Sequence, residues 1–186
     1  MANRSSFYQW LVRFSSSRTL LTLFILSFLF NIVIMPGTQW QMDLRSGGVE
    51  PLDLSFYYTS DEALERVEAF GETRPFYAVV ELTADLIYPL VYGFFLSVLL
   101  VTLYRRGFAV TSRIQMVAFL PLLSMLFDYA ENLSIAYLLL TYPAQSPLVA
   151  TYAGFFTMLK WFTLFLTLVA VLVGFVAFLI QGLRRR

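Results

Sequence analysis

Four apolar stretches dominate this sequence and limit what it can fold into. Each is long enough for a helix to cross the hydrocarbon core of a bilayer, which takes about 20 residues. Inside a bilayer every backbone N–H and C=O must be paired within the segment, so such stretches fold as helices. We therefore expect an all-α integral membrane protein, a four-transmembrane-helix bundle, with spans at residues 19–35, 76–104, 114–140 and 148–180.

The composition agrees with a single membrane domain over residues 1–186. The chain is 59% hydrophobic and only 13% charged, which is typical of a membrane protein. It contains no Cys and no His, which excludes disulfides, thiol chemistry and the commonest general base. The sequence also lacks a phosphate-binding loop and a Gly-rich dinucleotide motif. We therefore predict no cofactor and no nucleic-acid partner.

Basic and acidic residues fall on opposite sides of the four predicted spans. Arginines occupy the N-terminal segment 1–18, the loop 105–113 and the tail 181–186, and none of these segments contains Asp or Glu. Most acidic residues lie in the loop 36–75. The positive-inside rule therefore predicts cytoplasmic termini and an outer position for the loop 36–75. We expect a plasma membrane or a bacterial inner membrane.

The N-terminal segment contains a short amphipathic pattern. Phe7, Trp10, Leu11 and Phe14 follow one another at helical spacing, which predicts a helix lying in the cytoplasmic interface. Its plain role is to anchor the first span, and its alternative role is to recruit a partner.

The loop 36–75 contains a second amphipathic pattern. It begins with Pro36-Gly37, a pair that we expect to end the first span. Thr59 and Glu62 have the spacing of a capping box, and a short apolar stripe follows them. We therefore expect an amphipathic helix over residues 60–70, which either covers helix ends or forms a lid over a pocket.

Polar side chains converge inside the predicted spans. Charged residues at membrane depth are costly and mark functional sites by default. At about 1.5 Å of rise per residue, polar positions on all four spans fall in one layer of the outer half. The residues that we expect to bind a ligand are Asn31, Asp85, Tyr88, Tyr92, Asp128, Glu131, Asn132 and Lys160.

Two charged residues near this layer admit plainer explanations. Glu81 lies towards the outer surface, where we expect it to be solvated. Lys160 either extends to the outer headgroups or pairs with a buried carboxylate.

Three of the predicted site residues, Asp85, Asp128 and Glu131, bring up to three negative charges together. Close carboxylates in a low dielectric need compensation. Three solutions are open. Some of the carboxyls hold a proton, or a hard divalent cation binds the carboxylate oxygens. Alternatively, a cationic ligand binds there and lies against the nearby aromatic rings. No spacing matches a dedicated metal motif.

These features predict a pocket for an amphiphilic or cationic small molecule or a lipid. An enzyme would use Asp128, Glu131 and Asp85 for acid/base chemistry on a lipid-like substrate, although we favour a role without catalysis. One alternative is a proton- or cation-handling transporter or channel subunit that acts as a homo-oligomer. Another is a structural or assembly subunit of a larger membrane complex.

In layout, the chain resembles the emopamil-binding and sigma-2-receptor group, which are small helical bundles with acidic residues in a membrane-accessible pocket. The absence of His departs from the sterol-isomerase branch of that group and argues against isomerase chemistry.

Overall fold

The computed structural model describes residues 6–184, and this part of the chain is helical with no strand. Residues 1–5 of the predicted N-terminal segment and residues 185–186 of the predicted basic tail lie outside it. Four helical stretches are long and apolar enough to cross a membrane: Ser17–Ser46, Gly71–Gly107, Arg113–Thr141 and Pro147–Arg184. The all-helical fold with four such stretches confirms the prediction at that level.

The first long stretch does not end at Pro36-Gly37, so that prediction is wrong. It consists of α2 (Ser17–Leu29), a π-helical turn η1 (Phe30–Ile34) and α3 (Met35–Ser46). Because α3 begins directly after the π turn, Pro36 lies in the first turn of α3, a position in which proline is tolerated. The helix ends instead at Gly47, whose φ of 73° gives the left-handed cap that favours glycine.

The second stretch is broken near one end. It comprises η3 (Gly71–Thr73), α5 (Arg74–Glu81) and α6 (Ala84–Gly107). The third comprises a 3₁₀ segment η4 (Arg113–Phe119) and α7 (Leu120–Thr141).

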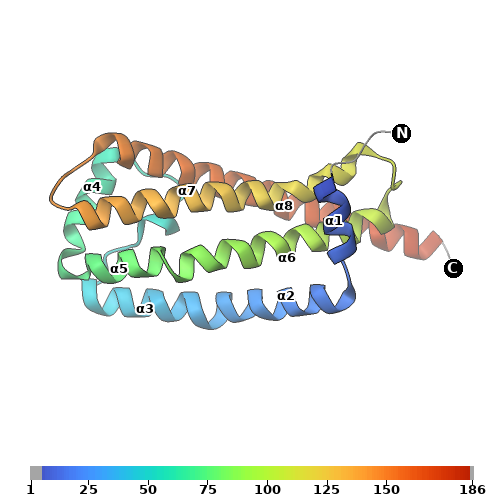
Figure 1. The fold of residues 1–186 in the computed structure, drawn as a ribbon, viewed down its shortest axis with the longest axis horizontal. Helices are drawn as coiled ribbons and strands as arrows, with labels where there is room; N and C mark the ends of the chain where they lie inside the picture. Colours follow the sequence, from blue (N-terminus) through green and yellow to red (C-terminus); the bar gives the residue numbers. More distant parts are fainter. Residues whose placement is uncertain (1–5, 185–186) are drawn as a thin grey trace.

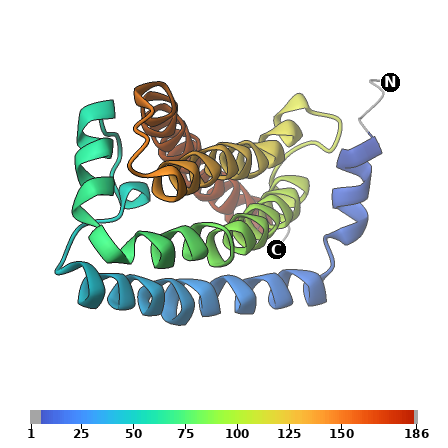
Figure 2. The same cartoon turned by 60° about the vertical axis from the view of Figure 1, so that its left-hand side comes forward.

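The fourth stretch is the single helix α8 (Pro147–Arg184). The helices α6, α7 and α8 pack against one another, and α2 with η1 lies along α6 (Figures 1 and 2). The first long helix thus forms an outer layer on a three-helix core.

The two ends of the bundle differ. One end, which we call the α4 end, carries η2 (Leu52–Leu54) and α4 (Ser60–Ala69). The other, the α1 end, carries α1 (Ser6–Phe14), the connection from α6 to η4, and the C-terminal part of α8 (Figure 1). Each end has its own buried hydrophobic cluster, around Tyr58, Phe70 and Tyr77 at the α4 end and around Tyr8, Leu100 and Tyr104 at the α1 end.

The helix α4 confirms the predicted amphipathic helix. Its capping box is complete: Glu62 N donates to Thr59 Oγ1 at 3.3 Å, and Thr59 N donates to Glu62 Oε2 at 2.7 Å. The Thr59 backbone N–H, and then its hydroxyl, lower the pKa of the exposed Glu62 carboxyl. Ala63 and Val67 are buried, and α4 packs on α8.

The helix α1 confirms the predicted N-terminal helix, although its buried face differs from the apolar stripe. Tyr8 and Leu11 are buried against the rest of the protein, whereas Phe7, Trp10 and Phe14 are exposed. The exposed aromatic rings form a row along one side of α1.

Candidate functional site

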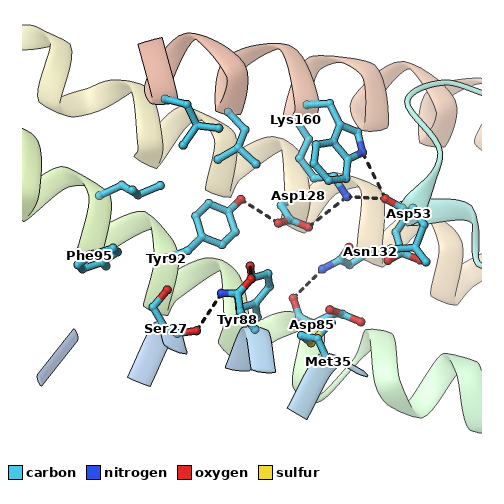
Figure 3. A pocket seen from close by; sticks show the side chains of 16 residues that line it. Ser27, Met35, Asp53, Asp85, Tyr88, Tyr92, Phe95, Asp128, Asn132 and Lys160 are labelled. Carbon is cyan, nitrogen blue, oxygen red and sulfur yellow. Dashed lines mark hydrogen bonds and ion pairs between the residues drawn. The ribbon is translucent and has the colours of Figure 1, made fainter. Parts of the chain in front are cut away.

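A cavity of about 430 Å³ lies between the first long helix, α6, α7 and α8. Its two ends differ in chemistry (Figure 3). Towards the α4 end it is lined by polar side chains, which are Asp53, Asp85, Asp128, Asn132 and Lys160. Towards the α1 end it is lined mainly by apolar ones, which are Phe95, Leu96, Leu164 and Leu168, with the hydroxyl-bearing Ser27 beside them. From Asp85 to Leu96 the cavity follows α6 for about 16 Å, at the usual helical rise.

Lys160 points into the protein and pairs with two carboxylates from α7. Its Nζ lies 2.5 Å from Glu131 Oε2 and 3.9 Å from Asp128 Oδ1. The side chain is only 9% exposed. Of the two alternatives for Lys160, the structure therefore shows pairing with buried carboxylates.

Glu131 lies behind Lys160 and does not line the cavity. It is fully buried, and its Oε1 accepts a hydrogen bond from Thr157 Oγ1 at 2.6 Å. The Tyr58 hydroxyl lies 3.2 Å from the same Thr157 oxygen. Burial, and then the Glu131 charge, raise the pKa of the Tyr58 phenol well above its usual value. Glu131 thus balances the charge of Lys160 from within the protein.

Asp128 faces the cavity and is held by an aromatic side chain. Tyr92 OH donates to Asp128 Oδ2 at 2.8 Å, and the Tyr92 ring meets the Tyr88 ring edge-on at 5.2 Å. Tyr88 OH in turn donates to Asn31 Oδ1 at 2.9 Å, which links α6 to the π turn of the first helix. π turns are frequent at functional sites, and this one positions Asn31 at the cavity wall.

Asn132 and Asp85 meet through a backbone carbonyl that a proline leaves free. Pro89 lies inside α6 and has no N–H to donate to the carbonyl four residues earlier, that of Asp85. Asn132 Nδ2 donates to this Asp85 oxygen at 2.6 Å. The carboxylate of Asp85 accepts no hydrogen bond and forms no ion pair within residues 6–184, although it lines the cavity. It is therefore the uncompensated acid of the site.

A loop residue that the sequence analysis missed closes the polar end. The backbone oxygen of Asp53 accepts hydrogen bonds from Lys160 Nζ at 3.2 Å and Trp161 Nε1 at 3.3 Å. Tyr77 OH donates to Asp53 Oδ1 at 2.7 Å and accepts from Leu52 N at 2.9 Å. Asp53 and Leu54 line the cavity, whereas no residue of α4 does. The segment around η2, rather than α4, covers the cavity.

The expectation that Glu81 is solvated is wrong. Its side chain is fully buried, and neither carboxylate oxygen has a hydrogen-bond partner among the described residues. Asp53 and Asp85 are among the charged groups close enough to act on it. Burial arises because α5 packs against α7 and the segment around η2 packs over this end of the bundle.

The structure also bears on the divalent cation that the sequence left open. Within residues 6–184, no three carboxylates are grouped so that they could hold a metal ion. The ammonium of Lys160 lies between Asp128 and Glu131 and supplies a positive charge to both carboxylates.

No family model, curated protein or solved structure matches this chain. The site is therefore interpreted from its own geometry.

Proposed function

We propose that the protein spans a membrane four times, with the α1 end in the cytoplasm and the α4 end outside. Two observations support this proposal. The four long helices expose apolar side chains along their length, such as Phe24, Ile32 and Phe165. All charged residues of segments 1–18, 105–113 and 181–186 are arginines, as the positive-inside rule requires of cytoplasmic segments.

We propose further that the cavity binds a cationic amphiphile, a molecule with an amine group and a hydrocarbon part. The amine would lie at the polar end, and the hydrocarbon part between Phe95, Leu164 and Leu168. Ligand sites are typically apolar pockets with a few placed polar groups that orient the ligand. This cavity has that division along one axis.

The unpaired carboxylate of Asp85 is the observation that carries the proposal. Lys160 is engaged by Glu131 and Asp128, so it leaves Asp85 without a counter-ion. A buried charge needs a partner, and a ligand ammonium would supply it. The rings of Tyr88 and Trp161, which also line the cavity, offer the aromatic faces that ammonium groups favour.

The margins of the cavity suggest that the ligand arrives through the bilayer. Three lining residues, Asn31, Leu54 and Leu168, are exposed on the outside of the bundle. They belong to the first long helix, the segment around η2 and α8 respectively. An amphiphile dissolved in the outer leaflet could reach the polar end by passing between these elements.

Native mass spectrometry of the detergent-purified protein tests the proposal. The wild type should retain a co-purified molecule or, after addition, dodecylamine, and dodecanol of equal chain length should bind far more weakly. Asp85→Asn should lose most of the dodecylamine binding, because its carboxylate supplies the missing charge. Asp43→Asn removes an exposed acid at the same end and should bind dodecylamine like the wild type.

Equal binding of dodecylamine and dodecanol would contradict a charge-selective site. Unchanged dodecylamine binding by Asp85→Asn would contradict the role of that carboxylate. A folded Asp85→Asn protein, judged by its elution and circular dichroism, is required for the second conclusion.

A second candidate function is proton transfer by a transporter or channel subunit. Glu81 favours it, because this buried carboxyl has no hydrogen-bond partner among the described residues and lies near the acids of the cavity. Proteoliposomes with an internal pH-sensitive dye would test it. Proton flux in the wild type that Glu81→Gln abolishes would favour this function over simple binding.

A further inference from the structure

A second groove, wholly apolar, lies towards the α1 end and shares no lining residue with the acidic cavity. Its volume is about 350 Å³, and it runs between α1, α2 and α6. The walls are formed mainly by Trp10, Phe14, Leu23 and Phe94. The rings of Trp10 and Phe14 lie 4.5 Å apart and tilted, and those of Trp10 and Phe94 form a T-shaped pair at 6.0 Å, so aromatic side chains from two helices form one wall.

Three arginines without an acidic partner among the described residues line depressions beside this groove. Arg13 follows the groove residues on α1 and lines a neighbouring depression together with Arg105 of α6. Arg105 and Arg106 line the next depression, beside Ser15 and Thr102. Within residues 6–184 the only ion pairs are those of Lys160, so none of these arginines has an acidic partner. An anion that binds these arginines therefore has no carboxylate of residues 6–184 to displace.

The position of α1 is set by contacts that leave the groove and the arginines accessible. Tyr8 OH donates to Gln115 Oε1 at 3.0 Å, and Gln115 Nε2 donates to Tyr104 O at 3.0 Å. Leu11 is fully buried beside Tyr8. These contacts hold one face of α1 on the bundle, while the side chains of Trp10 and Arg13 remain exposed.

We propose that this region binds an anionic phospholipid of the cytoplasmic leaflet. One acyl chain lies in the groove beside Trp10 and Phe14, and the phosphate lies against Arg13 and Arg105. Apolar walls alone would accept any lipid. Arg13 and Arg105 add the preference for negative charge, because basic side chains near a membrane surface attract anionic headgroups.

Fluorescence quenching by brominated lipids tests this site. A Trp40→Phe/Trp161→Phe protein keeps Trp10 as its single tryptophan. It is reconstituted in phosphatidylcholine with a small fraction of either brominated phosphatidylglycerol or brominated phosphatidylcholine. Brominated phosphatidylglycerol should quench Trp10 at a lower mole fraction than brominated phosphatidylcholine. Arg13→Gln/Arg105→Gln should weaken its apparent affinity by roughly fivefold for each arginine removed, the ratio expected of one basic side chain near a charged lipid.

The matched control is Arg113→Gln, which removes an exposed arginine at the same end that lines neither the groove nor the depressions. It should keep the wild-type preference. Equal quenching by both lipids, or none, would overturn the site. A preference that survives in Arg13→Gln/Arg105→Gln would overturn the assignment of these arginines. The inference depends on membrane insertion but not on the amine site, which native mass spectrometry tests separately.

Discussion

The α4 half and the α1 half of this bundle solve the problem of buried polarity in opposite ways. The α4 half buries Glu81, Asp85, Asp128, Glu131 and Lys160, and loop backbone around η2 covers them. In the α1 half the buried polar side chains are neutral, and the arginines remain exposed. Within residues 6–184, acidic and basic side chains are therefore buried only in the half that the segment around η2 covers, and only some of them are paired there. The two halves should respond differently to substitution.

The largest effect is expected from Lys160→Met. It leaves Asp128 and Glu131 buried without their cation, and removing one partner of a buried ion pair costs about 3–5 kcal/mol. The free energy of unfolding in mixed micelles would measure the loss.

Adding Glu131→Gln to Lys160→Met should recover part of this loss, because a neutral amide needs no counter-ion. In the α1 half, Arg113→Gln should change stability by less than about 0.5 kcal/mol. A loss no larger in Lys160→Met than in Arg113→Gln would remove the basis of the comparison.

Substitution of Gly154 tests the contact between α8 and the loop that covers the buried charges. A Cβ on Gly154 would overlap the backbone oxygen of Tyr58, so α8 can approach the loop this closely only because residue 154 has no side chain. Gly154→Ala should cost about 1–3 kcal/mol, as overpacking does, and should also weaken dodecylamine binding. Thermal unfolding and native mass spectrometry measure the two effects.

Two alanine variants serve as controls for Gly154→Ala. On Gly37 a Cβ would meet no atom within 4 Å, so Gly37→Ala should not destabilise the protein. On Gly174, in the α1 half, a Cβ would lie 2.6 Å from the Tyr104 ring. A side chain can move where backbone cannot, so Gly174→Ala should leave dodecylamine binding unchanged even if stability falls.

The neutral polar contact of the α1 half should matter less than Lys160. Gln115 joins Tyr8 to the backbone oxygens of Tyr104 and Ala109. Gln115→Leu removes three side-chain hydrogen bonds at this end and should cost about 1–3 kcal/mol. Urea unfolding of Gln115→Leu and of Lys160→Met under the same conditions ranks the two losses of stability. A loss for Gln115→Leu that exceeds that of Lys160→Met would reverse the expected order of the two halves.

A smaller effect is expected at the start of α4. Thr59→Ala removes the side-chain half of the capping box and should cost about 1 kcal/mol. Ser16 caps α2 in the same manner, accepting from Thr19 N at 3.1 Å, so Ser16→Ala is the matched variant in the α1 half. The two losses should agree, because a cap depends on local geometry. Thermal unfolding of both proteins makes the test.

The smallest effect is a pH dependence at Glu62. Its carboxyl has a pKa below the ordinary value when folded, so its stabilising contribution is complete above the pKa of the unfolded chain. That contribution is lost as the pH falls through the folded pKa. Wild type should therefore be more stable than Glu62→Gln at pH 7, and the difference should vanish in acid. A difference that grows as the pH falls would contradict this sign.

Much of the fold follows from local patterns in the sequence. Apolar length predicts the four long helices, and the spacing of Thr59 and Glu62 predicts α4. Pro36-Gly37 misled the prediction because a π turn, which leaves no sequence signature, places Pro36 in a first helical turn. The helical rise also predicted that polar positions on the four spans lie in one layer.

The site itself was only partly predictable, because half of its chemistry depends on tertiary contacts. Nothing local to Asp53 indicates that its backbone oxygen reaches Lys160. The solvation expected for Glu81 ignored the segment that covers it. The direction of Lys160 was open because a lysine beside Trp161 can extend to headgroups or turn inward, and only the positions of α7 and α8 decide between them.

Under the proposed four-span arrangement, the ion pair between Glu131 and Lys160 would also affect how the chain enters the membrane. These residues belong to helices α7 and α8, which are joined by the few residues between Thr141 and Pro147. A helix carrying either charge alone would be costly to transfer into lipid, by about 3 kcal/mol at the bilayer centre. As a hairpin, the two helices can cross into lipid with the charges already joined. The same contact that assembles the site would thus ease the biosynthetic insertion of the half of the chain that contains it.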